Sequence, residues 1–138
     1  MRRALVPFVF VFVFSFACAH QQPLYQRLGG APVVASIVDS FVERFADDTR
    51  VAPTFAKTDI PKFRKLLSEQ ICNLTGGGCT YTGRSMPSSH EGLHITESQF
   101  NAIVEDLQDA MNRQRIPIEL QNELIATLAP LREGIIHK

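Results

Sequence analysis

The chain has 138 residues, 45% of them hydrophobic, and its 14 basic side chains balance its 14 acidic ones. This length fits one domain. The absence of a basic surplus gives no support to nucleic-acid binding, so we expect a single globular domain without a nucleic-acid partner.

The first 19 residues are typical of a secretory signal. Arg2 and Arg3 precede an almost unbroken apolar run from Ala4 to Phe16, which is too short to be a stable membrane anchor. Without the two arginines, 12 basic residues face 14 acidic ones, so residues 20–138 would form an exported domain of net charge about −2.

Two modes of cleavage remain open for this signal. Ala17-Cys18-Ala19 has the small residues that an ordinary signal peptidase needs. Ser15 to Cys18 also loosely matches a bacterial lipobox, in which Cys18 becomes the lipidated first residue. We favour the lipobox because cysteine is otherwise an unusual choice there. The domain is expected to be exported and either periplasmic or anchored to the membrane, with membrane contact only through a lipid at Cys18.

The rest of the chain predicts helices and no alternating strand. A first short segment ends at Gly29-Gly30, and Pro32 opens the next helix. The apolar stripe of that helix consists of Val34, Ile37, Val38, Phe41, Val42 and Phe45. We expect the helix to stop at residues 46–48 and a short turn to follow from Val51 to Phe55.

A third helix is predicted after Asp59, a suitable cap. Its apolar face consists of Phe63, Leu66, Leu67, Ile71 and Leu74, and the glycines at 76–78 end it. Residues 79–93 are expected to be irregular, because Gly83, Pro87 and Gly92 break helices.

Two further helices complete the predicted domain. Thr96 to Gln99 form a capping box, and the helix after it carries Phe100, Ile103, Val104, Leu107 and Met111. The last helix begins at Ile116-Pro117, and Pro130 predicts a kink within it. The domain therefore has four principal helices and one histidine-bearing loop.

Cys72 and Cys79 are separated by six residues that include three glycines. In an oxidising compartment this flexible loop would let them pair as a disulfide, and two small buried thiols are the alternative. A zinc site is not indicated, since four soft ligands at usable spacing are missing.

His90 stands alone between the glycine-rich stretch and the helix that begins near Thr96. A lone histidine before a helix is more often a surface or capping residue than a metal ligand. Because no second catalytic group lies at motif spacing, the chemistry that suits it is axial ligation of a haem iron.

The surrounding pattern strengthens this interpretation. The chain combines Gly29-Gly30, Gly76-Gly77, Tyr81-x-Gly83 and Met86-x-x-x-His90-x-Gly92. Each glycine pair alone is weak, but the joint pattern resembles the group I truncated haemoglobins from about Leu24 to Ile136. The resemblance implies an all-α, globin-like two-over-two helical sandwich around a haem.

The resemblance also implies roles for individual residues. His90 would be the proximal ligand of the haem iron and Phe55 would stack on the haem, with Met86, Ile95 and Phe100 as apolar lining on the proximal side. Arg84 and Lys62 would pair with the haem propionates, unless they are ordinary surface charges. His94 is expected to be exposed or beside a propionate, because Gly92 argues against a helix there.

The distal side departs from the pattern of the family. Many members place a tyrosine on the second helix and a glutamine on the third, whereas this chain offers Phe41 and then Phe63, Leu66 and Leu67. Gln70 lies about one turn further along and is expected to miss the iron. An apolar distal side makes tight oxygen storage or efficient dioxygenase activity doubtful.

The function implied is reversible binding of oxygen, CO or NO by haem b (iron protoporphyrin IX), in an oxygen-binding protein rather than a dedicated enzyme. A nitric oxide dioxygenase or a peroxidase-type haem enzyme is one alternative. A haem-free helical interaction module is another, although His90 and Phe55 count against it.

Overall fold

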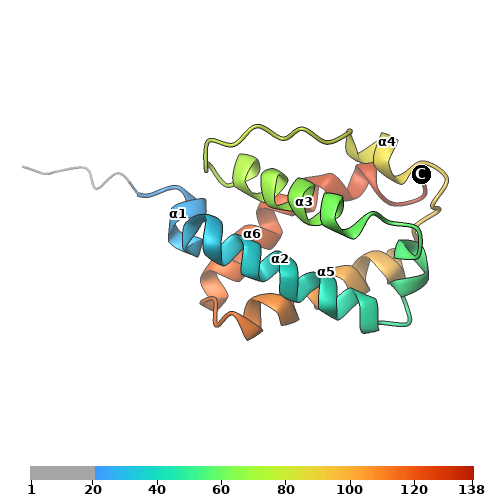
Figure 1. Ribbon diagram of the computed structural model, residues 1–138, viewed down its shortest axis with the longest axis horizontal. Helices are drawn as coiled ribbons and strands as arrows, with labels where there is room; N and C mark the ends of the chain where they lie inside the picture. Colours follow the sequence, from blue (N-terminus) through green and yellow to red (C-terminus); the bar gives the residue numbers. More distant parts are fainter. Residues whose placement is uncertain (1–20) are drawn as a thin grey trace, which may run out of the picture.

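A computed structural model describes residues 21–138 of the chain (Figure 1). The elements of this part are α1 (Leu24–Leu28), α2 (Gly30–Asp47), the 3-10 helix η1 (Ala52–Phe55), α3 (Ile60–Leu74), α4 (Met86–His90), α5 (Glu97–Arg113), α6 (Ile118–Leu128) and the 3-10 helix η2 (Ala129–Gly134). Among the helices of residues 21–138, none is both long and apolar enough to cross a bilayer. The predicted signal lies outside these residues.

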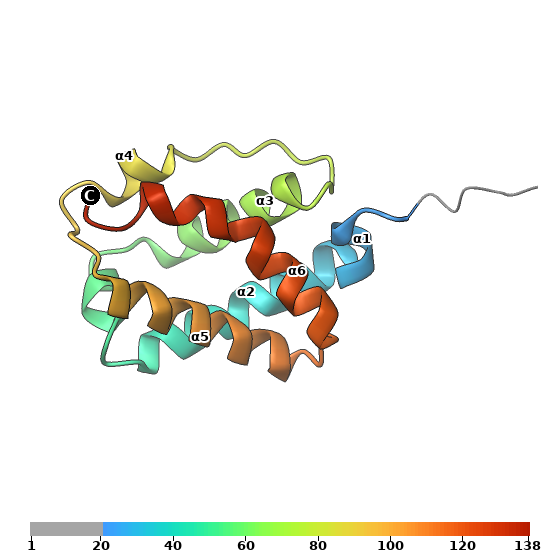
Figure 2. The same cartoon turned by 180° about the vertical axis from the view of Figure 1, so that it is seen from behind.

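The four principal helices form two antiparallel pairs. Helices α2 and α3 make the first pair, and α5 with α6 and its continuation η2 makes the second, which lies behind the first in Figure 1 and in front in Figure 2. Helix α2 is central, because it packs against both α3 and α5. This arrangement confirms the predicted all-α, two-over-two sandwich.

Most helix boundaries follow from the local chemistry that the sequence displays. Gly29, at φ 110°, ends α1 in the left-handed region that glycine reaches without strain. The Asp59 carboxylate accepts a hydrogen bond from the Lys62 amide at 3.1 Å and caps α3. Thr96 and Gln99 form the predicted capping box of α5. The start of α2 was predicted two residues late, because Gly30 rather than Pro32 begins it.

The prediction for residues 79–93 was wrong in one respect. Helix α4 forms inside this segment, and His90 is its last residue. The Ser85 side chain accepts a hydrogen bond from the Ser88 amide, and Pro87 occupies the first turn, where its missing N–H costs nothing. His90 is therefore held by helical backbone.

The predicted kink at Pro130 falls where the helix type changes. The α-helical part of α6 ends at Leu128, and the tighter η2 carries the chain on to Gly134. The last residues then turn towards the segment that follows α4, where the C-terminus lies in Figures 1 and 2. There, the His94 amide donates to the Lys138 carbonyl at 2.9 Å and the His137 amide donates to the Ile95 carbonyl at 3.0 Å.

Two hydrophobic clusters form the core. The first joins α1, α2, α3, α5 and α6 and contains Leu24, Leu28, Val34, Ile37, Val38, Ile71, Met111, Ile116 and Leu124. The second contains Phe41, Val42, Phe45, Val51, Ala102 and Ala110. Burying an apolar side chain of this size stabilises a fold by about 1.5–3 kcal/mol. Phe55, Phe63 and Leu67 pack against the second cluster and are only half-buried.

Candidate functional site

A cavity of about 840 Å³ lies between the two helix pairs. This volume is within the usual range for binding sites of small molecules and cofactors. The walls include all nine residues that the sequence assigned to a cofactor site, namely Phe41, Phe55, Phe63, Leu67, Arg84, Met86, His90, Ile95 and Phe100. The fold thus brings together residues that are up to 59 positions apart in the chain, from Phe41 to Phe100.

Much of the cavity wall is apolar and incompletely buried. Phe63, Leu67, Phe100, Ile103 and Leu107 all line the cavity, and each is half-buried. A flat apolar group between the helix pairs would remove the remaining exposed surface of these side chains from water. Burial of apolar surface contributes about 25 cal/mol per Å², so the hydrophobic effect would favour binding of such a group.

Three phenylalanines of this wall, Phe41, Phe55 and Phe63, pack against the buried ring of Phe45 behind them. The rings of Phe45 and Phe55 stack with centroids 4.0 Å apart, and Phe63 meets both edge-on at 5.6 Å. Phe41 meets Phe45 edge-on at 5.3 Å. Aromatic pairs in such geometries contribute about 0.5–1.5 kcal/mol beyond area burial. Phe55 is therefore held in place from behind by Phe45 and can present a fixed face to a planar ligand.

His90 is half-buried at the end of α4, and its imidazole is oriented by the backbone of the same helix. Nδ1 lies 2.8 Å from the Met86 carbonyl oxygen. A carbonyl can only accept, so Nδ1 carries the proton and donates it. The lone pair of the neutral ring then resides on Nε2. This arrangement is common for histidines that bind a metal through the other nitrogen.

The other histidines of the described chain do not share this position. His94 is exposed, as expected, and its positive φ of 49° takes it out of any helix with His90. Within residues 21–138 no group of three or more His, Cys, Asp or Glu side chains could hold a bare metal ion. A single nitrogen donor suits a metal that already carries its other ligands, as the iron of a haem does.

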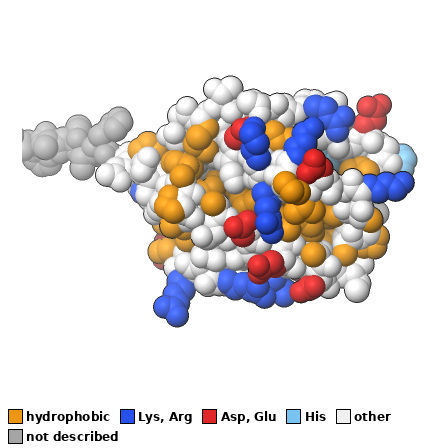
Figure 3. Space-filling view, in the orientation of Figure 1, with side chains coloured by type: hydrophobic (Ala, Val, Ile, Leu, Met, Phe, Trp, Pro, Cys, Tyr) orange, Lys and Arg blue, Asp and Glu red, His pale blue; other side chains and the backbone are white. Residues whose placement is uncertain are grey.

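Basic side chains outnumber acidic ones along the polar part of the cavity wall. Lys57, Lys62, Lys65 and Arg84 line it, against the single carboxylate of Asp59. In the space-filling view, hydrophobic side chains gather on the right-hand side of this face, with Lys and Arg side chains beside them (Figure 3). Charge-assisted hydrogen bonds to carboxylates are among the stronger polar contacts, so this edge suits the propionates of a haem.

The three residues that the sequence assigned to the distal side, Phe41, Phe63 and Leu67, all line the cavity and are apolar. Gln70 also belongs to the cavity wall, and its Nε2 lies 3.6 Å from the sulfur of Met86. This contact directs the amide towards α4.

Sequence reasoning missed several polar residues of the wall. Tyr81, Thr82 and Lys65 line the cavity but were not proposed as site residues. The Tyr81 hydroxyl donates to the Arg84 carbonyl at 2.9 Å, and burial raises the pKa of this phenol. The Tyr81-x-Gly83 motif was the signal in the sequence that could have identified Tyr81 as a site residue. Glycine is needed at 83 because a side chain there would collide with the Tyr81 ring.

The pairing of Cys72 and Cys79, which the sequence left open, is present in the structure. The two residues form a disulfide with Cα atoms 5.6 Å apart. It joins the last turn of α3 to the segment that leads to α4.

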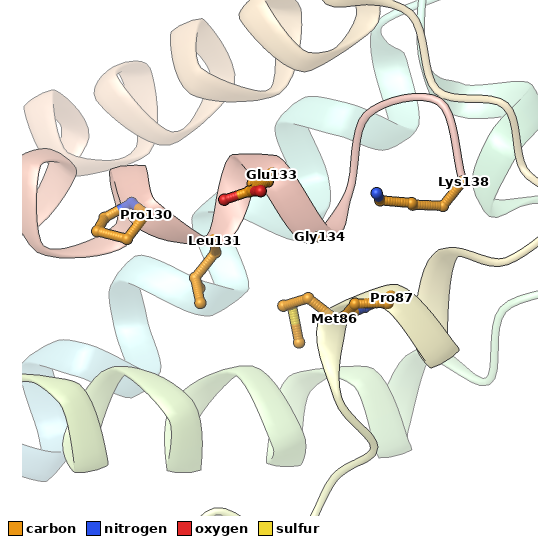
Figure 4. A pocket seen from close by; sticks show the side chains of 7 residues that line it. All are labelled: Met86, Pro87, Pro130, Leu131, Glu133, Gly134 and Lys138. Carbon is orange, nitrogen blue, oxygen red and sulfur yellow. The ribbon is translucent and has the colours of Figure 1, made fainter.

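A second, smaller hollow of about 430 Å³ lies between α4 and η2 (Figure 4). Its lining consists of Met86, Pro87, Pro130, Leu131, Glu133, Gly134 and Lys138. A side chain at Gly134 would place its Cβ 2.9 Å from that of Met86, so glycine allows η2 to approach α4 closely. No histidine belongs to this lining, and the hollow does not compete with the larger cavity as a haem site.

Comparison with known proteins agrees with this geometry. Residues 23–137 match the family model of the bacterial-like globins. The chain is 31% identical over 115 residues to the group 1 truncated hemoglobin GlbN of Nostoc sp. (strain MUN 8820), covering 83% of this chain and 98% of that protein. It is 32% identical over 119 residues to the corresponding protein of Synechocystis sp., covering 83% and 93%.

Solved structures show the same fold. The truncated hemoglobin of Tetrahymena pyriformis in its Fe(III) form superposes with a TM-score of 0.82 at 26% identity, covering 85% of this chain and all of that one. The 2/2 hemoglobin of Synechococcus sp. PCC 7002, solved in the cyanomet state with covalently attached heme, gives 0.78 at 27% identity, covering 83% and 98%. The chain therefore belongs to the bacterial-like globin family, among the haem-binding group 1 truncated haemoglobins.

Proposed function

We propose that the chain holds haem b through Nε2 of His90 and binds a diatomic ligand reversibly on the opposite face of the haem. The observation that carries this proposal is the bond from His90 Nδ1 to the Met86 carbonyl at 2.8 Å, on the wall of an apolar cavity of about 840 Å³. When bound, the haem iron supplies the ligand-binding chemistry.

Different residues around the cavity would hold the iron, the ring face and the propionates of the haem. The bond to Met86 would fix the ring plane of His90 and leave Nε2 as the nitrogen that faces the iron. Phe55, backed by Phe45, offers a flat face for stacking. Arg84 and Lys62 would bind the propionates, since both line the cavity as cations.

On the ligand side, Phe41, Phe63 and Leu67 would exclude water from the bound ligand. They donate no hydrogen bond to it, so the chain would hold oxygen less tightly than relatives with a tyrosine or glutamine donor. We therefore favour exchange of oxygen, CO or NO over storage. For the same reason we favour reversible ligand binding over nitric oxide dioxygenase or peroxidase activity.

The visible spectrum of purified protein tests the proposal. A haem globin should show a strong band near the blue edge of the visible range, with shifts among ferric, ferrous and CO-bound forms. A colourless protein that takes up no added haem would contradict it and would favour the alternative of a haem-free interaction module.

We also propose that the domain is exported and anchored by a lipid on Cys18. The disulfide between Cys72 and Cys79 supports the export, because such bonds persist in oxidising compartments and are rare in the bacterial cytoplasm. The lipid anchor rests on the loose lipobox before Cys18.

A further inference from the structure

The segment between α3 and α4 forms one wall of the haem cavity without being a helix itself. It runs as an extended stretch above α3 in Figure 1. Four consecutive residues of it line the cavity, Tyr81 to Arg84. A wall made of irregular backbone needs anchors outside itself, because fixing each backbone residue costs about 1–2 kcal/mol of conformational entropy.

The first anchor is the disulfide. Cys72 is 1% exposed in the last turn of α3, and its bond to Cys79 fixes the start of the wall. Beside it, the Asn73 side chain donates to the Cys79 carbonyl at 2.9 Å. Gly77 lies so close that an added Cβ would be 2.5 Å from the Cys72 sulfur. The chain is thus held against α3 where the wall begins.

The second anchor is Glu69, one turn before the disulfide on α3. Its carboxylate accepts hydrogen bonds from the Thr82 amide at 3.1 Å and the Thr82 hydroxyl at 2.7 Å. Lys65 also donates to it. These bonds, that from Lys65 first, lower the pKa of Glu69 to about 2, so the carboxylate is ionised throughout the neutral range.

Both anchors hold the segment that carries Arg84, one of the four cations that line the cavity. Glu69 holds Thr82, and the Tyr81 hydroxyl donates to the carbonyl of Arg84. The backbone that carries Arg84 is held to α3 by the disulfide, the Asn73 amide and the Glu69 carboxylate. If either anchor were released, Arg84 would have to be ordered again before it could meet an anionic group.

We propose that Glu69 and the Cys72–Cys79 disulfide are positioning groups: they hold the Tyr81–Arg84 wall against the propionates of the haem. Haem retention would then depend on the oxidation state of the disulfide. The inference rests on the proposed function of the cavity. A dithiol would release the wall by thiol–disulfide exchange: the Cys72–Cys79 bond takes up two electrons and two protons as two thiols, and the dithiol becomes a cyclic disulfide.

The test is the rate at which ferric haem leaves the protein for an excess of a haem-free acceptor globin. Haem should leave about tenfold faster from Glu69→Gln, which loses the charged acceptor of the Thr82 and Lys65 bonds. The double variant Cys72→Ser/Cys79→Ser, which loses the covalent anchor, should show a change in the same direction and of similar size. Ile116→Val is the matched control, because Ile116 is buried in the core but does not line the cavity. It should lower stability while leaving haem loss within twofold of the wild type.

Two further arms separate positioning from general destabilisation. A dithiol should speed haem loss from the wild type but not from the double serine variant. Haem dimethyl ester, which lacks the propionate charges, should leave wild type and variants at similar rates. In the haem-bound protein, amide hydrogen exchange at residues 80–84 should rise in both anchor variants.

Equal haem loss from wild type, double serine variant and Glu69→Gln would overturn the inference while the haem assignment stands. The inference would also be overturned if the anchor variants lost the dimethyl ester faster than the wild type by the same factor as they lose haem. If neither wild type nor variants take up haem, the proposed function falls and this inference with it.

Discussion

At the scale of single residues, the apolar composition of the distal wall bears directly on ligand binding. Phe41 is 5% exposed and lines the cavity together with Phe63 and Leu67. A hydrogen-bond donor stabilises bound oxygen, which is partly anionic, more than it stabilises CO, which is less polar. An apolar wall therefore predicts fast oxygen release and a low preference for oxygen over CO.

Phe41→Tyr tests this prediction by adding a hydroxyl at the wall. Hydrogen bonds to charged partners contribute about 1.5–3 kcal/mol, so oxygen release should slow by about tenfold or more, with less change for CO. Leu67→Gln adds an amide from α3 and should act in the same direction. Stopped-flow measurement of ligand release gives both rates. If the wild type already releases oxygen slowly and neither variant changes it, another donor such as Gln70 faces the ligand.

A second residue-scale feature lies outside the cavity. Asp106 on α5 is 2% exposed, and within residues 21–138 its Oδ2 has no hydrogen-bond partner. Burial first, and then the charge of Asp48, raise the pKa of Asp106 above its ordinary value of 3.8. The folded state therefore prefers the protonated acid, and stability is lost as the pH rises from about 3.8 through the raised pKa.

Asp106→Asn should remove this cost. At pH 7 the variant should melt at a higher temperature than the wild type, and the difference should shrink towards pH 3, where the wild-type carboxyl is also neutral. Thermal unfolding followed by circular dichroism at several pH values measures the effect. A variant that melts at a lower temperature at pH 7 would mean that the ionised carboxylate has a stabilising partner.

At the scale of elements, local signals in the sequence account for most of the fold. Gly29, Asp59 and the capping box of Thr96 mark helix ends, because each satisfies backbone groups within four residues of itself. Helix α4 was not predicted, since it is a five-residue helix in a stretch full of breakers. A five-residue helix is not stable alone, so α4 depends on its contact with η2. That contact joins distant parts of the chain and cannot be predicted from the local sequence around Ser85.

The capping box gives the prediction for this scale. Thr96→Ala removes the acceptor of the Gln99 amide at 3.2 Å and should cost about 0.5–2 kcal/mol in the free energy of unfolding. Thr96→Ser keeps the hydroxyl and should lose much less. Urea denaturation of the three proteins provides the values. Equal loss in both variants would show that the methyl group, rather than the cap, matters.

At the scale of the whole molecule, the cavity divides into a predictable and an unpredictable part. His90, Phe55 and Phe63 could be assigned from the resemblance, because they lie in motifs or helices of standard spacing. Arg84 was assigned in the same way, but Tyr81 and Thr82 beside it were not, since their place depends on Glu69, thirteen residues before Thr82, and on the disulfide. Such contacts depend on how the chain folds back on α3 and leave no periodic signal in the sequence.

We predict that the host exports the whole chain and removes its signal segment. Mass spectrometry of the native N-terminus should find residues 1–17 removed and an acyl group on Cys18. A free His20 at the N-terminus would support ordinary signal cleavage instead. Protein from the cytoplasm that begins with Met1 would contradict both forms of export.

The central claim is that one nitrogen, Nε2 of His90, holds the haem. The most direct measurement is titration of ferric haem into haem-free wild type, His90→Ala and, as control, His94→Ala, whose histidine is exposed and does not line the cavity. We predict one haem per chain for the wild type and His94→Ala, sharply weaker binding for His90→Ala, and partial recovery of its spectrum with added imidazole. An unchanged ferrous spectrum in His90→Ala would contradict the claim.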